Sequence, residues 1–160
     1  MTLAPTWRIG TMTITLLALA FSAWAAGGGG GDAEDATPKS SEYKAGVEAI
    51  KAKDYAGGIE WMTKAIAVNS KDADAYNYLG YSHRKLGHFE EAVQNYTRAL
   101  ELDPDHRGAH EYLGEAYLEM NRPTEAKKHL AALDKLCWLP CEQFSDLKKA
   151  IAVYEKSHQG

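Results

Sequence analysis

A period of 34 residues recurs along the chain, and it limits the possible folds more than any other feature of the sequence. Gly46, Gly80 and Gly114 stand one period apart, in EYKAGVEAI, NYLGYSH and EYLGEAY. Further sets keep the same offset: Tyr55, Phe89 and Pro123; Gly58, Ala92 and Ala126; Met62, Tyr96 and Leu130; Ala65, Ala99 and Leu133; Val68, Leu102 and Leu136. Small residues recurring at a fixed period are typical of repeats built from two closely packed helices. The predicted units are residues 39–72, 73–106 and 107–140.

Each unit is predicted to form a helix, a turn and a second helix. In the second unit, apolar residues follow helical spacing on both sides of Gly87. Gly87 is expected to end the first helix in a left-handed conformation, and Pro104 to stop the second, because proline cannot continue the hydrogen-bond ladder. His83, on the apolar face of the first helix, is expected to be a core histidine with satisfied hydrogen bonds. Gly58 is expected to weaken its helix by about 1 kcal/mol relative to alanine.

The second unit, AYNYLGYSHRKLGHFEEAVQNYTRALELDP, resembles the tetratricopeptide repeat (TPR), in which W-x2-L-G-x2-Y is followed by A, F, A and P within one unit. The matching residues are Tyr76, Leu79, Gly80, Ala92, Tyr96, Ala99 and Pro104 in the second unit, Leu113, Gly114, Tyr117 and Ala126 in the third, and Ala45, Gly46, Tyr55 and Ala65 in the first. The chain departs from the pattern at Gly58, His83, Pro123 and Trp138. The resemblance implies an all-α fold, an α-solenoid of three TPR units that binds other proteins.

The segment after the third unit is predicted to form an amphipathic helix over residues 141–156. The residues that recur there at helical spacing are Phe144, Leu147, Ala150, Ile151 and Tyr154. The last unit of a stacked repeat leaves an apolar face that needs a cover. We therefore expect this helix to cap the open end of the stack. This tail also resembles that of small exported bacterial TPR proteins.

Residues 1–25 have the order of a cleaved export signal. Arg8 is the only charged residue before the glycine run, an apolar stretch follows, and AWA supplies the small residues of a cleavage site. This order predicts an exported protein, periplasmic or secreted, with no stable membrane insertion once the signal is removed. The alternative is an uncleaved anchor facing the periplasm, because residues 9–26 lack charge and approach the length of a membrane span.

Residues 26–41, AGGGGGDAEDATPKSS, contain almost no large apolar side chain. Such a segment cannot bury enough surface to offset the entropy of ordering its chain. It is predicted to be a flexible, disordered linker.

Composition and motifs argue against several classes of function. The net charge is −4 and Lys and Arg form no cluster, so nucleic-acid binding is not expected. G-x-S-x-G, P-loop and H-E-x-x-H motifs are absent from the sequence, which predicts no enzyme activity and no cofactor. His106 and His110 could share a metal with Asp103, Asp105 or Glu111. Ordinary surface polarity explains LDPDHRGAH equally well, so no metal site is predicted.

The resemblance also implies where a partner would bind. In TPR relatives, the first helix of each unit lines a concave groove. The corresponding residues singled out here are Tyr43, Val47, Ile50, Asn77, Tyr81, Arg84, Lys85, Glu111, Glu115 and Glu119. The groove would pass from apolar through basic to acidic, which suits a peptide or helix of mixed charge. Stacks of this kind can also pair through their ends, so a homo-oligomer is compatible with the sequence.

One subclass of TPR groove is not expected. Relatives that clamp the C-terminal carboxylate of chaperones use Lys, Asn, Asn, Lys and Arg at set places. The residues at those places here are Tyr43, Val47, Tyr78, Gly108 and Tyr112. The carboxylate clamp is therefore absent from this sequence.

Cys137 and Cys141 flank the residues Trp-Leu-Pro in LDKLCWLPCEQF. Pro140 is expected to break the helix between them, so that the pair straddles a turn in which a disulfide is geometrically possible. Trp138 is expected to pack at this joint. An oxidising compartment favours the bond, and two reduced, packed thiols are the plainer alternative. A Cu(I) site, with His129 as a further ligand, and a thiol-redox pair are the functional alternatives.

Overall fold

A computed structural model describes Met1 and residues 38–158. Residues 38–158 fold into seven α-helices and contain no strand. The helices are α1 (Ser41–Lys51), α2 (Tyr55–Val68), α3 (Ala73–Lys85), α4 (Phe89–Leu102), α5 (Arg107–Glu119), α6 (Pro123–Leu136) and α7 (Glu142–Ser157). Apart from Met1, the predicted signal at 1–25 lies outside the described residues. Residues 26–37 of the predicted linker also lie outside them.

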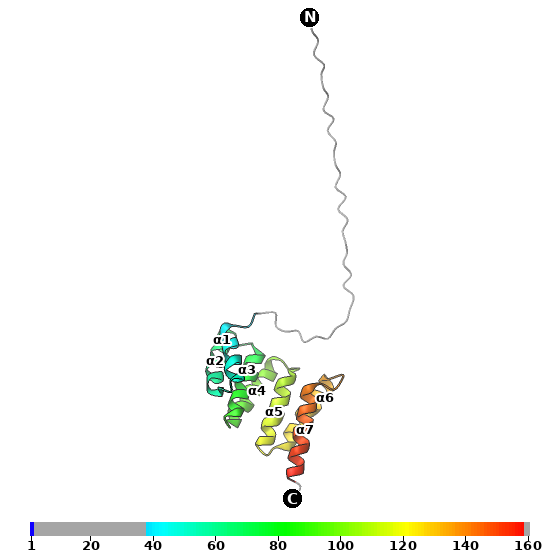
Figure 1. The fold of residues 1–160 in the computed structure, drawn as a ribbon. Helices are drawn as coiled ribbons and strands as arrows, with labels where there is room; N and C mark the ends of the chain where they lie inside the picture. Colours follow the sequence, from blue (N-terminus) through cyan, green and yellow to red (C-terminus); the bar gives the residue numbers. More distant parts are fainter. Residues whose placement is uncertain (2–37, 159–160) are drawn as a thin grey trace. The chain divides into compact units, whose positions relative to one another are not determined.

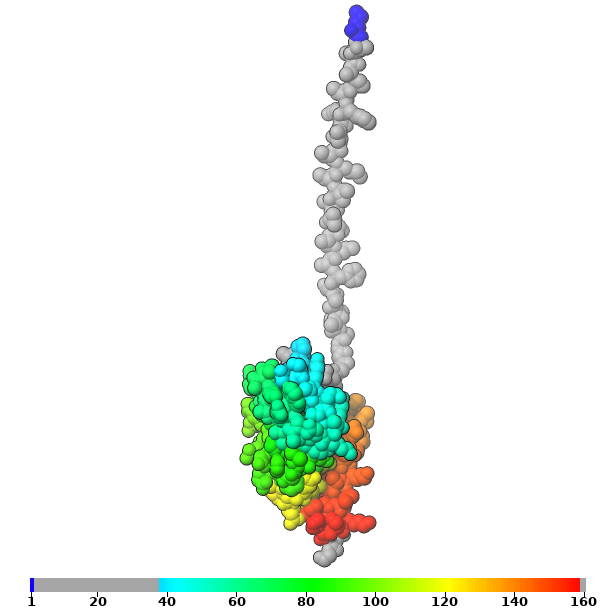
Figure 2. Space-filling model, turned by 60° about the vertical axis from the view of Figure 1, so that its left-hand side comes forward, coloured from blue at the N-terminus to red at the C-terminus, as the bar shows by residue number. Residues whose placement is uncertain are grey.

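The helices stack in chain order as three antiparallel pairs followed by a single helix (Figure 1). Contacts within the pairs α1–α2, α3–α4 and α5–α6 alternate with contacts between neighbouring pairs, and α7 packs on both α5 and α6. The space-filling view in Figure 2 shows the same series, with colours that pass from cyan at the upper end to red at the lower end. The predicted all-α solenoid is confirmed.

The turn inside each pair has the same backbone conformation at the same place in the repeat. Lys53, Gly87 and Asn121 stand one period apart and have φ angles of 61°, 81° and 58°. Glycine adopts this left-handed conformation without steric cost, and asparagine tolerates it better than most residues. The left-handed residue expected at Gly87 is therefore found in all three turns, including one built on lysine.

Side-chain caps define where several helices begin. Asp72 accepts a hydrogen bond from the Ala75 backbone N–H at 3.1 Å, and His106 accepts one from the Ala109 N–H at the same distance. These caps satisfy backbone donors that have no partner inside the helix. As a result α3 and α5 begin at the first residues of the second and third sequence units.

The core consists of three small clusters in series, one at each joint of the stack. Met62, Ala65, Ala75 and Leu79 form the first; Ala92, Tyr96, Leu113 and Ala116 the second; Leu118, Ala126, Leu133, Leu147 and Ile151 the third. Two members of the third cluster, Leu147 and Ile151, come from α7. The C-terminal helix thus covers the apolar end of the stack, as a repeat protein requires.

Gly58 has a packing role that helix propensity does not reveal. A Cβ atom at this position would lie 2.7 Å from the Ser82 hydroxyl oxygen and 2.8 Å from Cγ1 of Ile50. Ser82 is fully buried on α3 and Ile50 packs from α1. Because Gly58 has no side chain, α2 can pack closely against both α1 and α3 at this position.

Two expectations about single side chains are wrong. Trp138 does not pack at the joint between α6 and α7, because its side chain is 95% exposed. His83 is only half-buried, and its Nδ1 atom is buried with no hydrogen-bond partner among the described residues. Loss of solvent lowers the His83 pKa, and the nearby His88 adds to this. His83 is therefore a neutral, incompletely satisfied histidine.

No helix within residues 38–158 combines the length and the apolar character needed to cross a bilayer.

Candidate functional site

The predicted groove residues of the first unit lie on α1 and are largely used in packing. Tyr43, Val47 and Ile50 are all half-buried against the first core cluster. The Tyr43 ring meets the Tyr78 ring edge-on, with centroids 5.9 Å apart. This end of the groove is apolar, with little of each side chain exposed.

The middle of the groove is formed by α3. Tyr81 lies between two other rings, with its centroid 5.2 Å from that of Tyr112 and 6.1 Å from that of Tyr55. Lys85 is exposed and places its ammonium 5.1 Å from the centre of the Tyr81 ring. Asn77 is only 5% exposed, and its Oδ1 atom has no partner among the described residues. Of these predicted residues, Tyr81 and Lys85 can contact a partner readily, whereas Asn77 is mostly covered.

Arg84 ties α3 to α5. Its two terminal nitrogens lie 2.7 Å from Glu115 and 2.8 Å from Glu119, while the arginine itself is only 6% exposed. The guanidinium is buried, but the Glu115 and Glu119 side chains are 25% and 41% exposed, so solvent partly screens both ion pairs. Arg84 is predicted to contact a partner, and in the structure it also links the second unit to the third through these ion pairs.

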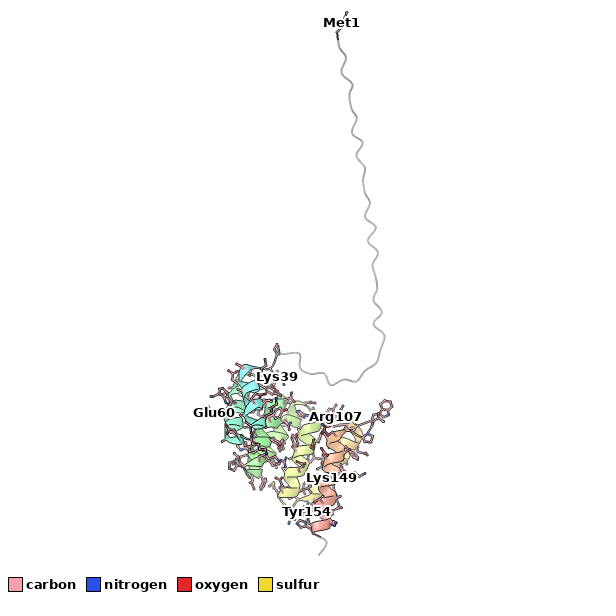
Figure 3. The ribbon with its side chains drawn as sticks, in the orientation of Figure 1. Met1, Lys39, Glu60, Arg107, Lys149 and Tyr154 are labelled. Carbon is pink, nitrogen blue, oxygen red and sulfur yellow. A yellow bond between two sulfur atoms is a disulfide. The ribbon has the colours of Figure 1, made fainter. Side chains whose placement is uncertain are left out.

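A cleft of about 750 Å³ lies between α5 and α7. Its lining residues are Glu111, Glu115, Leu118, Glu119, Asn121, Asp146, Lys149, Ala150, Val153, Tyr154 and His158. The glutamates are the predicted groove residues of the third unit, and α7 supplies the facing wall. Figure 3 labels Lys149 and Tyr154 on that helix. Clefts of this size commonly hold small ligands or side chains.

The α7 wall is the part of the site that the sequence prediction missed. Asp146, Lys149, Ala150, Val153 and Tyr154 recur at the spacing of one helical stripe. That stripe is adjacent to the buried one, which contains Leu147 and Ile151. Ala150 and Tyr154 belong to the predicted apolar face and pack against the third core cluster. Only the docking of α7 on α5 makes this stripe one side of a cleft.

Glu111 is the most unusual side chain in the cleft. It is 9% exposed, yet its carboxylate forms no hydrogen bond or ion pair within residues 38–158. Loss of solvent and the neighbouring carboxylates Glu115, Asp146 and Glu142 raise the Glu111 pKa to about 7, although Arg84 partly opposes them. Within residues 38–158, acidic groups therefore outnumber basic ones around the Glu111 carboxylate.

The three histidines near the third unit do not converge on one point. His106 contacts Asp74 through Nε2 at 3.0 Å, which lowers the Asp74 pKa, as does Lys39. His110 instead donates from Nε2 to the Pro104 carbonyl and accepts from His129 through Nδ1, each at 3.0 Å. Within the described part of the chain, no group of three His, Cys, Asp or Glu side chains could hold a metal ion.

The two cysteines flank the short loop between α6 and α7, where Cys137 follows the last residue of α6 and Cys141 precedes the first of α7. Their sulfur atoms lie 2.02 Å apart and their Cα atoms 5.7 Å apart, as in a disulfide. His129, the candidate third ligand of a copper site, is bound to His110 and stacks on Tyr117 instead. Burial and the proximity of His110 lower the His129 pKa to about 4. The structure therefore does not bring this imidazole into a site with the sulfurs.

Comparison with known families agrees with the repeat geometry. Residues 73–106 match the family described as tetratricopeptide repeat. Those residues are α3, α4 and the turns that flank them, at the centre of the stack. The second helix pair is therefore similar in sequence to a tetratricopeptide repeat. The flanking helix pairs have the same architecture, so the fold of residues 38–158 is a TPR fold.

Curated relatives resemble the TPR region over short stretches. Heat shock protein STI1 of Saccharomyces cerevisiae is 33% identical over 49% of this chain and 19% of its own length. Tetratricopeptide repeat protein 36 homolog of Nematostella vectensis is 32% identical over 48% of this chain and 42% of its own. Protein O-mannosyl-transferase TMTC3 of Homo sapiens is 33% identical over 40% of this chain but only 7% of its own. The chain thus spans less than half the length of these relatives.

Solved structures share the TPR fold over most of the described region. The TPR2B domain of yeast Sti1 in its pHsp70 complex gives a TM-score of 0.68 at 18% identity, covering 73% of this chain and 95% of that one. The second TPR of Spaghetti (RPAP3), bound to the HSP90 peptide SRMEEVD, gives 0.58 at 27% identity, covering 60% and 89%. The Yersinia enterocolitica translocator chaperone SycD gives 0.67 at 13%, covering 74% and 92%. The fold is thus one that other proteins use to bind protein segments.

Proposed function

We propose that the TPR region binds a segment of another protein along the groove of α1, α3 and α5, with α7 as its wall at the acidic end. The observation that carries this proposal is the cleft itself, because three residues predicted from the repeat pattern, Glu111, Glu115 and Glu119, line it together. Peptide binding by Spaghetti (RPAP3) and by Sti1 supports the proposal at the level of the fold.

The chemistry of the groove argues for a partner different from the HSP90 peptide of Spaghetti. That peptide, SRMEEVD, ends in acidic residues. Here the acidic end of the groove is itself rich in carboxylates, and like charges brought together across an interface reduce affinity. We therefore expect the partner segment to be apolar where it meets α1 and not acidic where it meets α5 and α7.

We also propose that the protein acts outside the cytoplasm, in the periplasm or as a secreted protein. The support is the order of charge, apolar stretch and small residues in the first 25 residues. The mass of the protein recovered from the native host tests this proposal. Cleavage after AWA is expected, and an intact N-terminus would instead favour the membrane-anchored form.

Selection from a random peptide library tests the groove proposal directly. The purified protein is expected to enrich a set of peptides from the library. Introducing Tyr81→Ala and Lys85→Glu together should reduce its affinity for these peptides. Lys85 is exposed and Tyr81 is half-buried, whereas Arg84 is unsuitable because replacing it would break the ion pairs that link α3 to α5. Circular dichroism of the double variant checks that the fold is kept. Glu60→Gln, on the exposed side of α2, is the control. Enrichment of no peptide, or equal binding to all three proteins, would contradict the proposal.

A further inference from the structure

We infer that the cleft between α5 and α7 receives a cationic side chain, lysine or arginine, from the bound protein segment. This inference rests on the proposed function and adds the chemistry of one contact. It starts from Glu111, which is more than nine-tenths buried, lines the cleft and has no partner within residues 38–158. A largely buried carboxylate loses part of its hydration without gaining a donor from the described residues, and a ligand that supplies a donor makes up for that loss.

The charges around Glu111 favour a cation over a neutral donor. Four carboxylates line the cleft, and Lys149 is the one lysine among its lining residues. Arg84 lies next to the cleft, but both of its terminal nitrogens are already bound, to Glu115 and Glu119. The site therefore retains excess negative charge, and charge-assisted hydrogen bonds from an ammonium or guanidinium are the strongest available there.

The apolar part of the cleft matches the rest of a lysine or arginine side chain. Leu118 comes from α5, and Ala150, Val153 and Tyr154 from α7. Val153 is 62% exposed, an uncommon state for a large aliphatic residue facing a cleft. Lysine and arginine bury their methylene stems on apolar surface while the charged head reaches polar groups. The cleft thus combines carboxylates with an apolar lining.

Lys149 makes the inference more specific. It lines the cleft and forms no ion pair with another residue of the described region. Its flexible ammonium repels an incoming cation and can compete with it for the carboxylates. Replacing Lys149 with methionine should therefore tighten the binding of a cationic peptide, which is the opposite of the effect expected for a residue that binds the peptide directly.

The test uses the peptides enriched from the random library, resynthesised as pairs in which each arginine is replaced by neutral citrulline, or each lysine by norleucine. Binding to the purified protein is measured by fluorescence anisotropy. We expect the enriched peptides to share a Lys or Arg beside apolar residues, and the neutral versions to bind roughly tenfold more weakly or worse. Glu111→Gln and Asp146→Asn should reduce the affinity for the cationic peptide, and Lys149→Met should raise it.

The matched control is Glu90→Gln, an exposed carboxylate on α4 outside the cleft, which should bind as the unmodified protein does. Circular dichroism of each variant separates a loss of binding from a loss of fold. Asp146 is exposed, so Asp146→Asn still tests the inference if Glu111→Gln alters the fold. If peptides bind in a Tyr81-dependent manner but bind Glu111→Gln and Asp146→Asn equally well, the inference is wrong while the groove proposal stands. If no peptide is enriched, both are wrong.

Discussion

The charge of Glu111 is expected to lower the free energy of unfolding of the protein. The residue is only 9% exposed and lies among other acids, and no donor within residues 38–158 pairs with it. A glutamine would fill the same volume without the charge. The excess charge is consistent with a binding role for the residue, and its effect on folding can be measured separately from any ligand.

The first prediction concerns Glu111→Gln and pH. The Glu111 pKa is about 7 in the folded protein against 4.5 for an ordinary glutamate, so between these values the folded state holds more protons than the unfolded state. The free energy of unfolding therefore falls as pH rises from 4.5 to 7. Glu111→Gln removes this loss, and at pH 8 the variant should be more stable than the unmodified protein by about 1–3 kcal/mol.

Urea unfolding at pH 5 and pH 8 measures this difference. Glu90→Gln, an exposed carboxylate for comparison, should match the unmodified protein at both values. An equal effect of Glu111→Gln at pH 5 and pH 8 would show that the carboxylate titrates normally in the folded protein.

At the scale of the helix, close approach of backbones depends on glycines that stand one period apart. Gly80 of α3 faces α4, where a Cβ atom would lie 2.8 Å from two carbons of the Tyr96 ring and 3.1 Å from the Ala92 carbonyl oxygen. Gly46 of α1 faces the flexible tip of Met62 instead, with Cε at 2.8 Å. The two equivalent positions thus differ in how easily the neighbour can move.

The second prediction compares alanine at these two positions. Gly80→Ala should destabilise the protein by about 1–3 kcal/mol, because a fully buried ring and a backbone atom must shift. Gly46→Ala should be close to neutral, since the movement of Met62 is offset by a gain of up to about 1 kcal/mol in helix propensity. Thermal unfolding of both variants decides the matter, and equal losses would contradict the packing argument.

The third prediction concerns the joint between α6 and α7. Replacing Cys137 and Cys141 with serine should cost about 2 kcal/mol or less, because the closed loop has only about five residues and so restricts the unfolded chain little. Urea unfolding of this variant beside the oxidised protein measures the difference.

A free-thiol count on protein taken from the native compartment separates the interpretations of the pair. No free thiol is expected, and two would overturn the proposed disulfide. Copper bound near one equivalent by the reduced protein would favour the metal-carrier alternative.

At the scale of the whole molecule, stability depends on the end of the stack. Leu147 is fully buried and Ile151 nearly so, both against residues of α5 and α6. Removal of residues 141–160 should uncover Leu118 and Leu133, lower the melting temperature and cause self-association, because an uncapped repeat exposes its apolar face. This fourth prediction is checked by calorimetry and light scattering.

Two point variants refine the test of the cap. Leu147→Ala should cost about 2–5 kcal/mol, as expected for a fully buried leucine. Val153→Ala, on the exposed side of the same helix, should have almost no effect on stability. A truncated protein that remains monomeric and equally stable would show that α7 is not a cap.

The sequence by itself determined the periodic part of this protein. The spacing of Gly46, Gly80 and Gly114 defined three helix pairs, and the apolar spacing of the tail defined a covering helix. These features follow from local periodicity and turn chemistry, which act over a few residues and can be recognised without knowing the fold. The left-handed turn at Gly87 belongs to the same class.

The tertiary structure alone decided the chemistry of the groove. Arg84 reaches Glu119, 35 residues away, and the repeat pattern does not predict that ion pair between α3 and α5. The docking of α7 on α5 placed Asp146 and Lys149 opposite Glu111, and it set the apolar face of the cleft. Which side chains meet across two helices depends on the angle and depth at which the helices pack, and the periodicity of either helix does not contain that information.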